Sequence, residues 1–313
     1  MIRSTLHRLF GMAVVMAIVI SLVFLIVHIT PGDPAAVMLG PDATGADIAA
    51  LRDQMGLNAP LWQQFFHYII GVLHGDLGRS IFLNIPVTEA LWQRAEPTFF
   101  LTLMALLVAT LIALPVGILS AYYRGSWFDQ IATSVAMLSA SIPSFWLGLL
   151  FIQFFAVKLG WFDTSGYGGP TATFGERMNH LLLPALSLGA VCSALIMRFT
   201  RASMLDVLND DYVRTARAKG MSEYRVVVKH AFKNALIPVV TVIGLTAALL
   251  ISGAIVTETV FGIPGVGSLT VSAVLRRDYP VIQGTLLVIS GLYVLMNFAV
   301  DMLYLWIDPR VRY

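Results

Sequence analysis

Long apolar stretches without a charged residue recur along this chain of 313 residues. Six of them separate successive Asp, Glu, Lys or Arg residues and are 20 to 28 residues long: 9–32, 97–123, 130–157, 178–197, 234–257 and 279–300. A helix needs about 20 residues to cross a hydrocarbon core of about 30 Å. Inside lipid every backbone amide must be paired within its own segment, so each stretch predicts a helix. The pattern predicts an all-α integral membrane protein with six transmembrane helices.

Composition agrees with this class. Only 12% of the residues are charged, compared with about 25% in soluble domains. The first stretch follows Arg3 and Arg8, as in a secretory signal peptide, but it exceeds the usual apolar region of about 7–15 residues. No Ala-x-Ala cleavage site closes it. We therefore expect residues 1–30 to be a retained first transmembrane helix.

The distribution of Lys and Arg predicts the orientation, because these residues resist translocation. If the N-terminus is inside, 13 of the 20 Lys and Arg residues fall in inside segments. This predicts cytoplasmic N- and C-termini, with a cytoplasmic tail at 309–313 and a periplasmic segment at 31–97. Helical spacing at 46–57 and the aromatic-rich stretch 60–75 predict amphipathic helices in that segment, the second at the membrane interface. Residues 98–308 are expected to form a five-helix core.

The segment 214–238 is unusual because it carries six Lys or Arg residues amid apolar sequence. At about 2.5 kcal/mol for each, burying them in lipid would cost on the order of 15 kcal/mol, so the segment is predicted to lie on the cytoplasmic side. Gly220 interrupts its helical pattern, and Ser222 can cap a second short helix. It could lie on anionic lipid, serve only as a topology signal, or dock to a soluble protein. The glycine break and the mixed charge favour docking.

The same segment resembles the EAA loop of ABC importer permeases, in which an EAA-x3-G pattern forms the helices that sit in a cleft of the ATPase. Arg214 and Thr215 stand where the pattern has Glu and Ala, whereas Ala216 and Gly220 match it. The usual I-x-L-P is absent ten residues further on, and the proline comes only at Pro238. The resemblance implies an ATPase-coupling loop at 204–233. Its predicted coupling residues are Arg214, Thr215, Ala216, Arg217, Gly220, Ser222 and Glu223.

Further stretches resemble one branch of these permeases, the subunits of dipeptide, oligopeptide, glutathione and nickel importers. In chain order they are TPGDP (30–34), GDLGRS (75–80), DYVRTARAKG (211–220), NALIPVVTVIGL (234–245), TETVFGIPGVG (257–267), RRDYPVIQG (276–284) and DPRVRY (308–313). Their order and spacing extend the resemblance over the whole chain. It implies the type I ABC importer permease fold, with six membrane-spanning helices in the bacterial inner membrane.

The resemblance also implies partners. These are a second homologous permease subunit, two P-loop ATPase subunits and a periplasmic or extracellular solute-binding protein, with no nucleic acid. ATP and Mg would be used by the ATPases, so this chain is expected to be non-catalytic and to bind no cofactor itself. The sequence is consistent with that expectation, because the phosphate-binding pattern G-x4-G-K-[ST] is missing.

The substrate is less constrained by the sequence. Peptides are expected from their frequency in the branch, and glutathione, nickel or another small solute is the alternative. A stand-alone secondary transporter is an alternative of another class, but such proteins usually bury ionisable residues and often contain repeats. His67 and His74 share a helix face without a third ligand at a suitable spacing, so we expect no metal site.

Two further features are candidate functional elements. Asp301 lies in the last predicted span, about 10 Å of helix rise before Asp308. An acid at membrane depth is a functional candidate, although a structural polar contact with a neighbouring span is the interpretation we favour. The sequence GIPGVG at 262–267, here called the glycine turn, is expected to need non-helical backbone at Gly262, Pro264, Gly265 and Gly267. It predicts a re-entrant turn, or else a periplasmic gate or a contact with the binding protein.

Overall fold

The structure, a computed structural model, describes residues 2–29, 34–40, 43–54 and 56–307. Its helices are α1 (Ile2–Ile29), α2 (Pro34–Leu39), α3 (Gly45–Gln54), α4 (Leu61–Leu73), α5 (Val87–Tyr122), α6 (Trp127–Ser141), α7 (Ser144–Phe151), α8 (Phe174–Leu208), α9 (Asp211–Ala218), α10 (Phe232–Val260), α11 (Val266–Arg276) and α12 (Tyr279–Ile307). Two π-helical segments, η1 (Ile152–Lys158) and η2 (Arg225–Ala231), continue α7 and precede α10. The described residues form no β-strand, so the prediction of an all-α protein is confirmed.

Within the described residues every predicted span is helical, but the third is not one straight helix. Five segments are long and apolar enough to cross a membrane: His7–Ile29, Val87–Tyr122, Phe174–Leu208, Arg225–Val260 and Tyr279–Val300. The third predicted span is the pair Trp127–Ser141 and Ser144–Lys158. The chain bends by 101° between these two helical segments. The break falls at Ile142, which is extended (φ −88°, ψ 127°) because Pro143 follows it.

The chain forms two compact units, each assembled from segments that are distant in sequence. The first contains the residues up to Glu96 together with Ser268–Val294. Within it α4 packs on the end of α1, where the Phe24 ring lies 5.2 Å from that of Phe65 and His28 Nε2 lies 3.1 Å from Gln64 Oε1. The buried Asp278 carboxylate accepts hydrogen bonds from the Ser80 hydroxyl (2.6 Å) and the Ile81 amide (3.2 Å).

The opposite face of α4 has no cover among the described residues. Trp62, Phe66, Ile70 and Leu73 recur at intervals of four, four and three residues and are all exposed. Side chains at this spacing share one face of a helix. The face is apolar and begins with a tryptophan, as expected for the predicted helix at the membrane interface.

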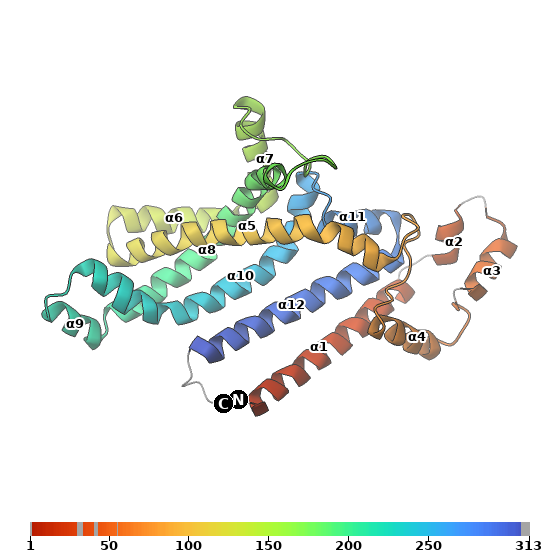
Figure 1. Cartoon of the computed structure of the whole chain (residues 1–313), viewed down its shortest axis with the longest axis horizontal. Coiled ribbons are helices and arrows are strands. Elements are labelled where there is room, and N and C mark those ends of the chain that lie inside the picture. The colour runs from red at the N-terminus through yellow and green to blue at the C-terminus, as the bar shows by residue number, and fades with distance from the viewer. Residues whose placement is uncertain (1, 30–33, 41–42, 55, 308–313) are drawn as a thin grey trace. The chain divides into compact units, whose positions relative to one another are not determined.

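The second unit contains residues 97–267 together with those from Leu295 onward. Here α8 contacts α10, α6 and α7, and α5, α6, α8 and α10 run beside one another in Figure 1. Glycines allow close approach of α5 and α8: a methyl group on Gly117 would lie 2.9 Å from Met197 O, and one on Gly189 would lie 2.6 Å from Ala105 O. Small residues at such crossings are the usual means of packing helices in a membrane.

Candidate functional site

The coupling loop (residues 204–233) lies at one end of the second unit, where α8 ends and α10 begins (Figure 1). Helix α9 follows α8 directly, and after Gly220 the chain becomes helical again at Glu223. The two helices expected around Gly220 are therefore present. The second does not stop before the next span, because it continues through η2 into α10 without a break.

Gly220 closes α9 with a left-handed turn. Its φ is +75°, and its amide donates to Arg217 O (2.9 Å) while the Met221 amide donates to Ala216 O (3.3 Å). These two bonds form a Schellman motif, which needs a residue with positive φ at this position. A methyl group on Gly220 would meet nothing within 4 Å. Glycine is therefore required here by the backbone conformation and not by packing.

One side of the coupling loop is fixed to the ends of three spans. Val213 and Ala216 of α9 pack with Val226, Val227 and Ala231 of η2 in one buried cluster. The same cluster includes Ala121 of α5, Met204 of α8 and Ala235 of α10. Because close-packed interiors transmit displacement, the loop and these helix ends are expected to move as one body.

The other side of the loop is polar and exposed. All six basic residues of the segment are exposed: Arg214, Arg217, Lys219, Arg225, Lys229 and Lys233. Arg217 Nε lies 3.0 Å from Glu223 Oε1, across the turn at Gly220, and Arg214 lies 3.5 Å from Asp211. Exposed ion pairs contribute only about 0–1 kcal/mol to the free energy of unfolding. These two pairs therefore orient side chains on the polar face but add little stability.

The predicted coupling residues thus gather in one loop with separate tasks. Thr215 donates its hydroxyl to Asp211 O (2.9 Å) inside α9, and Ser222 O accepts from the Val226 amide (3.1 Å) as the second helix starts. Ala216 belongs to the buried cluster, whereas Arg214 and Arg217 lie on the exposed face.

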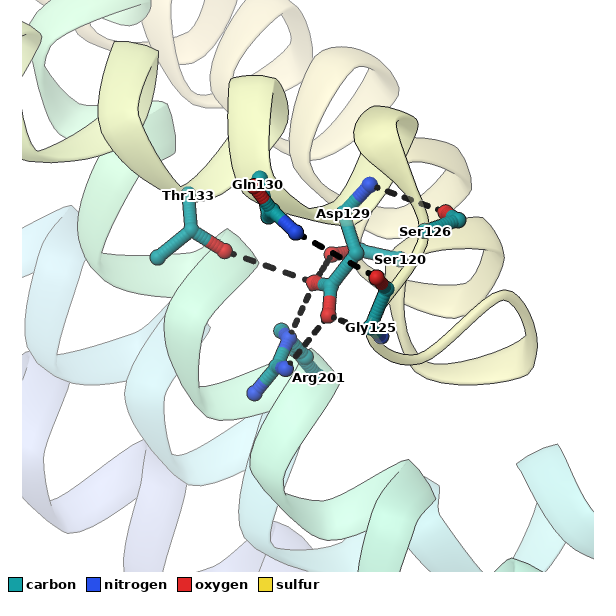
Figure 2. Close-up of polar contacts among 7 residues, drawn as sticks. All are labelled: Ser120, Gly125, Ser126, Asp129, Gln130, Thr133 and Arg201. Atoms are coloured by element: carbon teal, nitrogen blue, oxygen red, sulfur yellow. Dashed lines mark hydrogen bonds and ion pairs between the residues drawn. The ribbon is translucent and has the colours of Figure 1, made fainter.

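An ion pair that the sequence did not indicate lies beside the loop. Arg201 of α8 donates from Nε to Asp129 Oδ1 (2.6 Å) and from Nη2 to Asp129 Oδ2 (2.8 Å). The same carboxylate accepts from the Ser120 hydroxyl and from the Gly125 amide (2.9 Å), as Figure 2 shows. With only 6% of its side chain exposed, Asp129 joins α6 and the α5–α6 turn to α8. Its partner Arg201 lies three residues before Met204, which belongs to the buried cluster of the coupling loop.

The glycine turn lies at the opposite end of α10. Gly262 has φ +62° and lies beside Ser165, Pro264 is exposed, and Gly265 is buried. The expectation of non-helical backbone at Gly267 is wrong, because α11 already begins at Val266. The Phe261 carbonyl accepts from the Gly166 amide (2.8 Å), so loop 160–173 packs against the turn. The structure therefore separates the two predicted sites by the length of α10 and does not bring them together.

Comparison with known proteins identifies the family. Residues 113–313 match the family described as binding-protein-dependent transport system inner membrane component, and residues 1–102 match the N-terminal part described for the same systems. The chain belongs to this family. It is 45% identical to the glutathione transport system permease protein GsiC of Salmonella choleraesuis (strain SC-B67) and 44% identical to that of Escherichia coli (strain K12), in both cases over all of both chains.

Solved structures agree on the fold. The inward-facing MetNI methionine ABC transporter matches 70% of this permease and 96% of its own chain, with a TM-score of 0.59 and 19% identity. An amino acid ABC transporter matches 72% of the permease with a TM-score of 0.50 and 17% identity. The type I importer permease fold is thereby confirmed.

Family membership also confirms several expectations about the protein. The permease is a multi-pass protein of the bacterial inner membrane and a non-catalytic subunit, because a separate ATPase hydrolyses the ATP. Permeases of this family work with an ATPase and a substrate-binding protein. A stand-alone secondary transporter does not fit this membership.

Three sequence-predicted residues of the permease receive no role from the geometry. Asp301 lies in α12, but its side chain is outside the part of the structure that is described. His67 and His74 are both exposed, and His74 Nδ1 lies 2.8 Å from Ile70 O. Among the described residues no three His, Cys, Asp or Glu side chains gather as a metal site would require.

Glu258 received no role from the sequence, although it ends an apolar stretch and belongs to the segment TETVFGIPGVG. Its side chain is fully buried beside the glycine turn. The signal that could have found it is an acid at the end of an apolar span, followed closely by Gly265 and Gly267, which have no side chains.

Proposed function

We propose that this permease forms half of the translocation path of an ATP-driven importer of glutathione. The observation that carries the proposal is the 45% identity with glutathione permeases, which extends over the full length of both chains. The sequence alone favoured peptides, with glutathione as an alternative, and the relatives support the alternative better. The two expectations are chemically close, since glutathione is itself a tripeptide with one γ-linked bond.

The complex we propose contains a second homologous permease subunit, two P-loop ATPase subunits and an external binding protein. The coupling loop carries two features that suit docking into an ATPase. Its apolar side is anchored to α5, α8 and α10, and its opposite side exposes six basic residues. An anchored, charged projection can transmit a push from a soluble partner to the spans, whereas a helix lying on lipid needs no such anchor.

Transport would proceed by alternating access between two rigid bundles. The binding protein delivers the solute at the predicted outer side, near the glycine turn. When ATP draws the two ATPases together, the coupling loop moves with them. Because α10 joins the loop to the turn, the movement reaches both ends of the path.

The first test is purification of the tagged permease from its host in mild detergent, followed by mass spectrometry of the attached proteins. A second permease and P-loop ATPases should be recovered. The purified complex, reconstituted with its binding protein, should take up radiolabelled glutathione only when ATP is supplied. Unlabelled glutathione should compete, and excess dipeptide or nickel should not. ATP-driven uptake of a dipeptide with no uptake of glutathione would overturn the substrate and leave the importer intact.

A further inference from the structure

Glu258 is a carboxylate enclosed by protein in a segment that crosses the membrane. It lies near the end of α10, its side chain has no exposed surface, and Thr98 of α5 donates a hydroxyl hydrogen bond to its Oε1 (2.6 Å). Burying an ionisable group at such a place is costly unless polar partners surround it. An apolar side chain could fill this space without the cost of burying a carboxylate. The presence of Glu258 therefore indicates a role for its polar contacts.

Thr98 connects this carboxylate to the start of the next helix. While it donates to Glu258, its oxygen accepts a hydrogen bond from the Val266 amide (2.9 Å), and Val266 is the first residue of α11. The first amides of a helix lack partners within the helix and carry partial positive charge. The chain Val266–Thr98–Glu258 therefore satisfies one of these amides and places a carboxylate beside the others.

The glycine turn is shaped around the carboxylate. A methyl group on Gly265 would overlap the carboxyl group of Glu258, and one on Gly267 would lie 2.9 Å from Glu258 Oε2. Both glycines are buried. A side chain at Gly265 would displace the carboxylate, whereas one at Gly267 would first meet the backbone of α10 at Ile255 Cα (2.5 Å) and then the carboxylate. The glycine turn can therefore lie close to Glu258 only with glycine at both positions.

We propose that Glu258 is the positioning residue of the glycine turn, which it locks onto α5 through Thr98. This inference rests on the proposed function, because it assumes that the glycine turn is a gate on the outer side of the membrane. Glu258 and the coupling loop share the continuous helical segment Arg225–Val260, so displacement at the loop alters the Glu258–Thr98 contact. Releasing the contact frees the turn, and restoring it closes the turn again.

The direct test measures how accessible the turn is. Pro264 is exposed, and Cys192 is the only native cysteine of this chain, so Pro264→Cys in a Cys192→Ser background gives this subunit of the assembled complex a single label site, which is read on the separated subunit. Its rate of reaction with a membrane-impermeant maleimide should rise about fivefold when Thr98→Val removes the bridging hydroxyl, the ratio expected for one hydrogen bond of ordinary net strength. Thr98→Ser, which keeps the hydroxyl, should restore the original rate. Equal rates in all three proteins would overturn the proposal.

A second readout separates positioning from simple instability. In the reconstituted importer, Thr98→Val and Glu258→Gln should reduce the solute carried per ATP, while ATP hydrolysis without binding protein changes less than about twofold. Loss of hydrolysis and of transport in parallel, with poor recovery of the complex, would indicate a folding defect and contradict the proposed lock. The labelling rate does not depend on which solute is carried. If the substrate assignment is wrong, Thr98→Val still raises the labelling rate of Pro264→Cys. If Glu258 does not position the glycine turn, Thr98→Val leaves that rate unchanged.

Discussion

The guanidinium of Arg201 holds the carboxylate of Asp129 through two hydrogen bonds, of 2.6 and 2.8 Å, although 72 residues separate them in sequence. The pair joins α8, which leads into the coupling loop, to α6 and the α5–α6 turn. A bidentate pair of this kind fixes both the distance and the relative orientation of the two helices. Force applied to the loop is therefore shared with α6.

Removing one partner of this pair should destabilise the permease. Arg201→Ala leaves the buried Asp129 without its cation and should lower the free energy of unfolding by about 3 kcal/mol. Arg214→Ala is the matched control, because it removes an arginine from an exposed pair with Asp211 and should cost less than about 1 kcal/mol. Thermal unfolding in detergent measures both. Equal losses in the two variants would show that the Asp129 contact has no special weight.

Gly220 provides a test of coupling that depends on backbone conformation alone. Gly220→Val places a β-branched residue at φ +75°, where such residues are strongly disfavoured, and should uncouple ATP hydrolysis from uptake. Gly220→Asn is the matched variant, since asparagine tolerates the left-handed conformation and the space around the residue is open. It should retain most of the transport rate. Normal uptake by the valine variant, with the complex assembled, would remove the coupling role from this turn.

The exposed face of α4 predicts an in-plane contact with lipid. In a Cys192→Ser background, spin labels at Trp62→Cys, Phe66→Cys and Ile70→Cys should be accessible to oxygen and protected from a water-soluble nickel complex. Labels at Phe65→Cys and Tyr68→Cys, whose native rings pack on Phe24 of α1, should not share this pattern. Protection from both reagents at the first three positions would instead indicate contact with another protein.

Orientation has its own test, because the charge distribution predicts that the coupling loop is cytoplasmic. In spheroplasts, an impermeant maleimide should not label Lys229→Cys in the coupling loop. It should label Asp163→Cys in loop 160–173, since both native residues are exposed. The reverse pattern would place the termini and the coupling loop outside and would contradict the proposed mechanism.

The sequence predicted most of the fold because membrane helices are set by local composition. The six apolar stretches, the helix at α4 and the break at Gly220 all follow from short windows of residues. The bend before Pro143 does not, because Pro97, Pro115, Pro184 and Pro238 lie inside helices that continue past them. The presence of a proline therefore does not show whether the helix breaks there or continues past it.

The candidate sites were predictable only where they form continuous segments. The coupling loop is a single stretch with its own charge and glycine signals. In contrast, Asp129 with Arg201 and Glu258 with Thr98 are pairs from different helices, and nothing local indicates which acid meets which partner. The contact of Arg201 with Asp129 became visible only in the three-dimensional packing.

The continuity of α10 gives the permease the geometry of a lever. Pro238 is the only proline inside that helix, and the 20 residues from there to Glu258 extend about 30 Å. A tilt of about 10° around Pro238 would carry Glu258 through an arc of about 5 Å, roughly one helical turn in length. A hydrogen bond fails after a small fraction of that travel. If the ATPase docks at the coupling loop as proposed, a modest rotation there would break the Glu258–Thr98 hydrogen bond completely at the far end of the helix.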